Sequence, residues 1–158
     1  MASLLIVVFA VRELRHHSLV AWQRADDLFI KVHTIAIKSF PTYERFELGS
    51  QVRRAAYSVA ANIVEGFARR SGRERLHFLN IAEGSLAEVG YCLHAACRLG
   101  YIDAGTLSDL ENDLAGVGKP LGGLIKSTRA MAVAAPIGAL LCAIAIGYWL
   151  SLQTFLPV

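Results

Sequence analysis

The stretch from Gln51 to Arg69 has the most regular pattern in the chain, that of an amphipathic α-helix. Its apolar residues recur at steps of three and four, which places them on one helix face. With the preceding leucine they are Leu48, Val52, Ala55, Ala56, Val59, Ile63 and Phe67. A polar stripe with the same steps runs beside that face. Its members are Gln51, Arg54, Ser58, Asn62, Glu65 and Arg69.

Two interpretations of the polar stripe are open. Charged residues are usually exposed, so the stripe could be a surface that meets water or a ligand. Small hydroxyl and amide groups among the charges instead suit hydrogen bonds and ion pairs between helices. We expect a structural stripe, in which replacing Asn62 or Glu65 by Ala costs about 1–3 kcal/mol. The residues expected in it are Arg54, Ser58, Asn62, Glu65, Arg69 and, from the next helix, Glu88. Glu65 and Glu88 are the expected partners of Arg54 and Arg69.

Three further stretches show helical periodicity, and Ser18 is the expected cap of the first. The four predicted helices cover about 18–39, 51–69, 73–99 and 107–124. Short breaks at Phe40-Pro41, Ser71-Gly72 and Gly100 separate them, and short connections make consecutive helices antiparallel. The sequence therefore predicts an all-α fold, an antiparallel up-down four-helix bundle with an extra hydrophobic C-terminal segment.

Glycines lead to two local expectations. Gly84, in the third predicted helix, would let another helix approach closely, and Gly90 also suggests a packing reason because glycine weakens a helix. The fourth predicted helix is rich in helix-breaking residues in its second half, where we expect a kink or fraying. These residues are Gly116, Gly118, Pro120, Gly122 and Gly123.

Both ends of the chain are apolar, which divides it into an extension (1–17), a bundle (18–128) and a tail (129–158). Met1 to Val11 carries no charge, and it is a flap on the bundle, an interfacial segment or an extension from an upstream start codon. No charged residue follows Arg129. Residues 130–152 are long enough to cross a membrane, and Lys126 and Arg129 precede them as positive-inside residues would. The alternatives are a fifth helix packed on the bundle and a non-native tail.

No constellation of residues indicates catalysis, a metal or a cofactor. The five histidines lack a metal-binding spacing such as His-x-x-x-His. Ser58 and Ser85 lack a histidine and an acid at helical spacing to activate them. The three cysteines, Cys92, Cys97 and Cys142, lie in apolar surroundings and are expected to be small buried residues of a reduced compartment.

Arginines are the best candidates for a ligand-binding site. Seven arginines and three glutamates lie between Arg45 and Arg75, and guanidinium groups suit phosphate oxygens. Those near the break at Ser71-Gly72 can spread out at one end of a bundle. The residues expected to bind nucleic acid are Arg53, Arg70, Arg73 and Arg75.

The second predicted helix, from Gln51 to Arg69, carries a recognisable sequence pattern. Its run Gln51-Val52-Arg53-Arg54-Ala55-Ala56, then Ser58-Val59 and Asn62-Ile63-Val64-Glu65-Gly66, resembles the signature of the four-helix-bundle proteins encoded in intervening sequences of bacterial 23S ribosomal RNA genes, the S23 ribosomal protein-like family. The resemblance covers about 18–127 and departs from the usual pattern at Val64 and Gly90. Further matches are Val20-Ala21-Trp22-Gln23, Phe40-Pro41, Phe78-Leu79, Gly84-Ser85-Leu86 and Gly100-Tyr101.

The resemblance implies an up-down bundle that assembles into a five-fold ring and has no enzymatic activity. A similar bundle, the accessory variability determinant of diversity-generating retroelements, is implicated in nucleic-acid binding. We therefore expect a cytoplasmic, non-enzymatic homopentamer that binds RNA or DNA through its basic patch. The alternative is an oligomeric scaffold or assembly protein that its tail, residues 130–152, tethers to a membrane.

Overall fold

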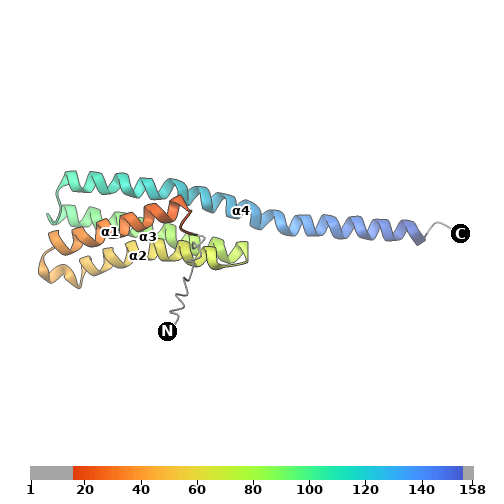
Figure 1. Cartoon of the computed structure of the whole chain (residues 1–158), viewed down its shortest axis with the longest axis horizontal. Helices are drawn as coiled ribbons and strands as arrows, with labels where there is room; N and C mark the ends of the chain where they lie inside the picture. Colours follow the sequence, from red (N-terminus) through yellow and green to blue (C-terminus); the bar gives the residue numbers. More distant parts are fainter. Residues whose placement is uncertain (1–15, 155–158) are drawn as a thin grey trace, which may run out of the picture.

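The computed structural model describes residues 16–154. Within that range it contains four α-helices, one short 3-10 helix and no strand, which confirms the predicted all-α class (Figure 1). The elements are α1 (Val20–Ser39), η1 (Thr42–Arg45), α2 (Leu48–Ala68), α3 (Gly72–Arg98) and α4 (Ala104–Thr154). The first helix follows Leu19, not the predicted cap Ser18.

The helices form an up-down bundle in which neighbours in sequence are neighbours in space. α1 packs on α2, α2 on α3 and α3 on α4, and α4 closes the bundle against α1. The connections are short, so each helix runs antiparallel to the one before it (Figure 1). One end of the bundle consequently holds the start of α1, the turn between α2 and α3, and the middle of α4.

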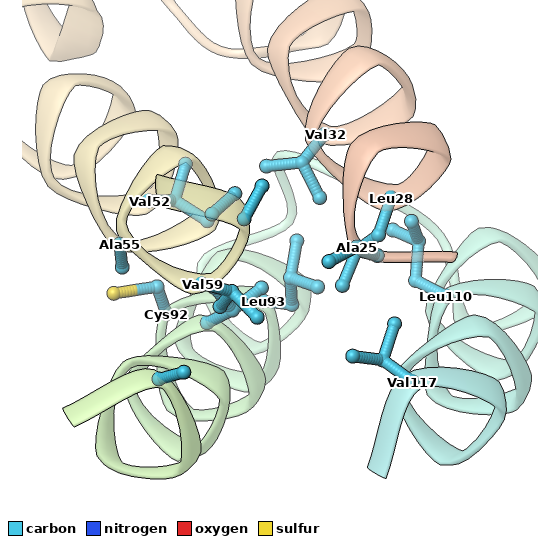
Figure 2. Packing of buried hydrophobic residues seen from close by; sticks show 14 of the residues in the cluster. Ala25, Leu28, Val32, Val52, Ala55, Val59, Cys92, Leu93, Leu110 and Val117 are labelled. Atoms are coloured by element: carbon cyan, nitrogen blue, oxygen red, sulfur yellow. The ribbon is translucent and has the colours of Figure 1, made fainter. Parts of the chain in front are cut away.

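The core is the space between these four helices, and all four contribute to it. Figure 2 shows Leu28 of α1, Val59 of α2, Leu93 of α3 and Val117 of α4 directed toward the centre. These side chains are at most 1% exposed. Burial of such apolar surface is the main force that holds a bundle together, and the stripes seen in the sequence supply it.

Local signals end and restart the helices. Gly100 has a φ of 77°, a left-handed conformation that suits glycine and terminates α3. The Ser71 hydroxyl caps α3 by accepting a hydrogen bond from the Glu74 backbone N–H at 3.5 Å. Asp103 caps α4 in the same way through Thr106 at 2.8 Å. Bonds from the Thr106 backbone N–H and hydroxyl lower the pKa of Asp103.

The structure corrects two sequence-based expectations about glycines, the fraying of α4 and the close approach of another helix at Gly84. α4 is one uninterrupted helix of 51 residues, so its glycines and Pro120 do not fray it. Contacts with α1 and α3 along its first half override the weak local propensity. Gly84 lies exposed on α3, and a Cβ built there would have no atom of another helix within 4 Å. Gly90, by contrast, faces α4, because a Cβ built there would lie 3.6 Å from Leu114 Cδ1.

The apolar tail continues α4 and does not form a separate helix. It extends beyond the other three helices (Figure 1). Among the residues that the structure describes, no helix is both long and apolar enough to cross a membrane. The side chains at 133–145 and 147–154 fall outside that description, as does the extension before residue 16. The interpretations of both apolar ends therefore stay predictions.

Candidate functional site

An open groove of about 520 Å³ lies at the end of the bundle where α2 turns into α3. Three segments form it: the α2–α3 turn, the first turn of α3, and α4 around residue 130. The helices are in contact here, because a Cβ at Gly72 would lie 3.5 Å from the Cβ of Ala132. The groove is lined by Arg70, Ser71, Gly72, Arg73, Arg75, Leu76, Thr128, Arg129, Met131 and Ala132.

Four guanidinium groups line this groove, which we call the basic groove. Arg70, Arg73 and Arg129 are exposed. Within residues 16–132, whose side chains the structure describes, none of the three has an ion-pair partner. They are therefore available to an anionic ligand.

Arg75 is held in place more firmly than the other three. Its Nη2 donates a hydrogen bond to the Arg69 carbonyl oxygen at 3.2 Å, and its guanidinium lies over the Phe67 ring, 5.1 Å from the centroid. Its Nε is shielded from solvent and has no acceptor among the described residues. A guanidinium group held in place on the bundle therefore forms part of the wall of the basic groove.

The backbone adds to the positive potential. α3 is 27 residues long and begins at the basic groove, so its N-terminal N–H groups and dipole favour an anion there. Glu74 opposes this field, but its side chain lines a neighbouring hollow with Arg69 and His77 and does not line the basic groove. The arrangement suits the geometry of phosphate oxygens, which guanidinium groups bind in pairs of hydrogen bonds.

The structure brings together three of the four arginines predicted to bind nucleic acid. Arg70, Arg73 and Arg75 share the basic groove. Arg53 lies near the start of α2, about 22 Å along the helix from its end at Ala68. Its Nη2 donates to the Arg45 carbonyl oxygen at 2.9 Å, close to the opposite end of the bundle.

Sequence reasoning missed Arg129 as a member of the site. The sequence showed it only as a charge that precedes the apolar tail. The signal that could have placed it is topological: in an up-down bundle, a long fourth helix returns to the end where the second helix turns into the third. Arg129 then lies beside the Arg70–Arg75 turn.

The polar stripe of α2 divides into a seam and a surface. The Ser58 and Ser85 hydroxyls are 2.8 Å apart and join α2 to α3. Asn62 Nδ2 donates to the Ser58 carbonyl oxygen at 2.8 Å and to the Ser58 hydroxyl at 3.0 Å. Ser85 is buried, whereas Ser58 and Asn62 are partly buried. These three side chains form the seam.

The charged members of the stripe lie at the surface. Glu65 pairs with Arg69 one turn later on the same helix, and both side chains are more than 40% exposed. The Arg69 guanidinium also lies over the Phe78 ring of α3, 4.9 Å from its centroid. Arg54 is exposed, and Glu88 accepts a hydrogen bond from Gln51. We expected Glu88 to pair with an arginine, and that expectation is wrong.

The cysteines show no reactive site among the described residues. Cys92 is buried and Cys97 is partly buried, and both are free thiols. Burial, and next the charge of Glu88, raise the pKa of Cys92, which keeps its thiol protonated. The side chain of Cys142 lies outside the described residues. Across residues 16–132, no group of three His, Cys, Asp or Glu side chains could hold a metal ion.

The structure is that of a small up-down four-helix bundle with a groove lined by four arginines at one end. The family model of the 23S rRNA-intervening sequence proteins matches residues 17–123. The chain therefore belongs to the 23S rRNA-intervening sequence protein family, as the resemblance of its second helix predicted.

A solved structure supports the fold. It is the crystal structure of a protein of unknown function from the S23 ribosomal protein family of Bacteroides thetaiotaomicron. That protein is 24% identical and gives a TM-score of 0.63 over 68% of this chain and 99% of its own. No curated protein is significantly similar in sequence. The family match ends at residue 123, before Arg129 and the apolar tail.

Proposed function

We propose that this protein binds the phosphate backbone of nucleic acid in the basic groove and catalyses no reaction. The observation that carries the proposal is the convergence of four guanidinium groups from three segments on one open groove at a helix N-terminus. Phosphate contacts of this kind supply affinity and position but do not read sequence. The proposed binding is therefore insensitive to base sequence.

The oligomeric state and the location of the protein are also proposals. Family resemblance supports a ring-shaped homo-oligomer, a pentamer, and a cytoplasmic location. It also supports a relationship to the accessory variability determinant of diversity-generating retroelements. In a ring, several copies of the basic groove would act on one nucleic acid, which raises avidity without new contacts. Sedimentation velocity tests the pentamer directly.

The salt dependence of binding tests the proposal. Affinity for a short labelled RNA is measured by fluorescence anisotropy between about 50 and 200 mM salt, where phosphate-driven affinity falls steeply. If one groove binds four phosphates, the slope of log affinity on log salt is about −3 for a single strand and nearer −4 for a duplex. Equal-length DNA in the same assay tells RNA binding from DNA binding.

Variants locate the binding surface. Replacing Arg70 and Arg73 together by Gln removes two phosphate contacts and lowers the magnitude of the slope by about 1.4 to 1.8. Arg98→Gln is the matched control, because Arg98 is an exposed arginine in the last turn of α3, at the other end of the bundle. Arg53→Gln tests whether the binding surface reaches the start of α2. A slope near zero for the parent protein, or equal losses in the Arg70/Arg73 and Arg98 variants, would refute the proposal.

A second candidate is an oligomeric scaffold tethered to a membrane. It is favoured by the extension of α4 beyond the bundle and by the lack of charge after Arg129. Truncation after Ala132 tests it, because the basic groove stays complete while the tail is removed. The scaffold function predicts that the parent protein floats with lipid vesicles and that the truncated chain does not. If, in addition, neither protein binds RNA, the scaffold function is supported and nucleic-acid binding is refuted.

A further inference from the structure

A second hollow lies between α1 and α2, on a different face from the basic groove. Its volume is about 370 Å³. Its walls are aromatic, and the small side chains of Ala60 and Ala61 leave space between them. We call it the aromatic hollow, and its lining residues are Trp22, Asp26, Phe29, Tyr57, Ala60, Ala61, Val64 and Glu65.

The walls of the aromatic hollow are apolar surface that the described part of the chain leaves uncovered. Tyr57 is 61% exposed. The Phe29 ring packs edge-on against it, with centroids 5.7 Å apart, and Trp22 and Phe29 are only partly buried. A contiguous, partly exposed aromatic patch of this kind is typical of a surface that another apolar segment covers.

The described chain begins at the edge of the aromatic hollow. The His16 and His17 rings both pack on the Trp22 ring, with centroid distances of 4.9 and 4.8 Å. The Leu19 backbone N–H donates to the His16 carbonyl oxygen at 3.0 Å, and Gln23 Nε2 donates to the His17 carbonyl oxygen at 2.7 Å. These bonds form a turn, so the preceding residues start beside Trp22.

The residues before this turn are complementary to the aromatic hollow in polarity and in charge. Met1 to Val11 is an uncharged apolar run, and Arg12, Glu13 and Arg15, with a net charge of +1, lie between it and the turn. The rim of the aromatic hollow carries the carboxylates of Asp26 and Glu65. The apolar run can pack on the aromatic walls, and the arginines can pair with the carboxylates of the rim.

The N-terminal segment is long enough to cover the aromatic hollow. From Trp22 to Phe29 the aromatic hollow follows seven residues of α1, about 10 Å. An extended chain covers about 3.3 Å per residue, so four residues span that length. The apolar run ends at Val11, four residues before Arg15, and is long enough to cover the aromatic hollow from one end to the other.

We propose that residues 1–15 fold back onto the aromatic hollow of the same chain. The apolar run covers Trp22, Phe29 and Tyr57, and the two arginines face the acidic rim. The segment is thus an intramolecular cover for the face between α1 and α2. This proposal is independent of nucleic-acid binding, since none of these residues lines the basic groove.

Trp22 fluorescence tests the proposal in the full-length chain. The sequence has two tryptophans, so Trp149→Phe leaves Trp22 as the only reporter. In that background Ile6, Val7 and Val8 are all replaced by Asp, which opposes both the apolar walls and the acidic rim. The expected result is a red shift of Trp22 emission and stronger acrylamide quenching, with the circular dichroism melting curve unchanged.

A second substitution shows where the segment binds. Ala61→Arg fills the aromatic hollow and repels Arg12 and Arg15, so it should abolish the effect of the three Asp substitutions on Trp22 emission and quenching. A synthetic peptide of residues 1–15, added to the triple-Asp variant, should restore the blue-shifted emission of Trp22. The same peptide should have no effect when the variant also carries Ala61→Arg. These results would support an intramolecular cover.

Two outcomes would overturn it. One is equal quenching of Trp22 in the parent and triple-Asp chains at every protein concentration. The other is protection of Trp22 that persists in the triple-Asp chain and disappears on dilution, which would show that a second copy of the protein covers the aromatic hollow.

Discussion

Two glycines offer a matched test of how α3 and α2 are packed. Gly84→Ala is expected to stabilise the protein by about 1 kcal/mol, because alanine is favoured over glycine by about that amount in an exposed helix interior. Gly84 lies in the middle of α3, and a Cβ there would meet nothing within 4 Å. The whole propensity difference should therefore appear in the free energy of unfolding.

Gly49→Ala should have the opposite effect. A Cβ at Gly49 would lie 2.7 Å from the Glu44 carbonyl oxygen, a backbone atom of η1 that cannot rotate away. Forcing an extra methyl group into a packed site costs about 1–3 kcal/mol. Gly49 is only the second residue of α2, so little helix propensity is gained in return. The expected net loss is about 1–2 kcal/mol.

Urea and thermal denaturation followed by far-ultraviolet circular dichroism measure both effects. A change of 1 kcal/mol corresponds to a shift in Tm of roughly 3 °C for a chain of this size. Gly84→Ala should raise Tm and Gly49→Ala should lower it. A clear loss of stability in Gly84→Ala would refute the reasoning, because it would show that a surface outside this chain packs on Gly84.

Three further changes test the seam, the surface pair and the cap of α4. Ser85→Ala removes the partner of Ser58 across the α2–α3 seam and should cost about 1 kcal/mol in urea denaturation; no change would show that the seam does not contribute. Glu65→Ala should cost only about 0.3–0.5 kcal/mol, less than the sequence-based expectation, because its pair with Arg69 is exposed and within one helix; a loss above about 1 kcal/mol would contradict the surface assignment. Asp103→Ala should lower Tm at neutral pH. Because the pKa of Asp103 is depressed by folding, its contribution is complete above its unfolded pKa of about 3.9 and is lost as the pH falls through the lower, folded pKa. A Tm difference that stays constant from neutral to acid pH would contradict this account.

The fold was predictable because each helix carries its own apolar stripe. The steps of three and four from Val52 to Ile63 and from Leu110 to Leu121 place these residues on buried faces, and all four are at most 1% exposed. The turn signal at Ser71-Gly72 was equally local, since the Ser71 side chain caps α3. Such features depend on near neighbours in the sequence, so periodicity finds them.

The errors arise where the outcome depends on distant parts of the chain. Gly84 has the same local signal as Gly90, yet only Gly90 faces α4, and periodicity alone could not tell them apart. The glycines of α4 predicted fraying from propensity, but packing against α1 and α3 keeps the helix continuous. The partner of Glu88 was wrong for a similar reason: the relative rotation of α2 and α3 selects Gln51.

The basic groove is assembled partly from outside the region that defines the family. Arg70, Arg73 and Arg75 lie within the matched residues 17–123, whereas Arg129 lies beyond them. Its place is set by Ile125 and Thr128, the last buried positions of α4 among the side chains that the structure describes. They are 6% and 2% exposed and hold this part of the helix on the bundle. Because α4 is continuous, the helix that carries Arg129 into the groove also carries the tail. A version of this chain that ended before Arg129 would keep the turn of three arginines but lose the wall opposite it. The family match therefore covers three of the four arginines of the groove, while the fourth lies beyond the matched residues.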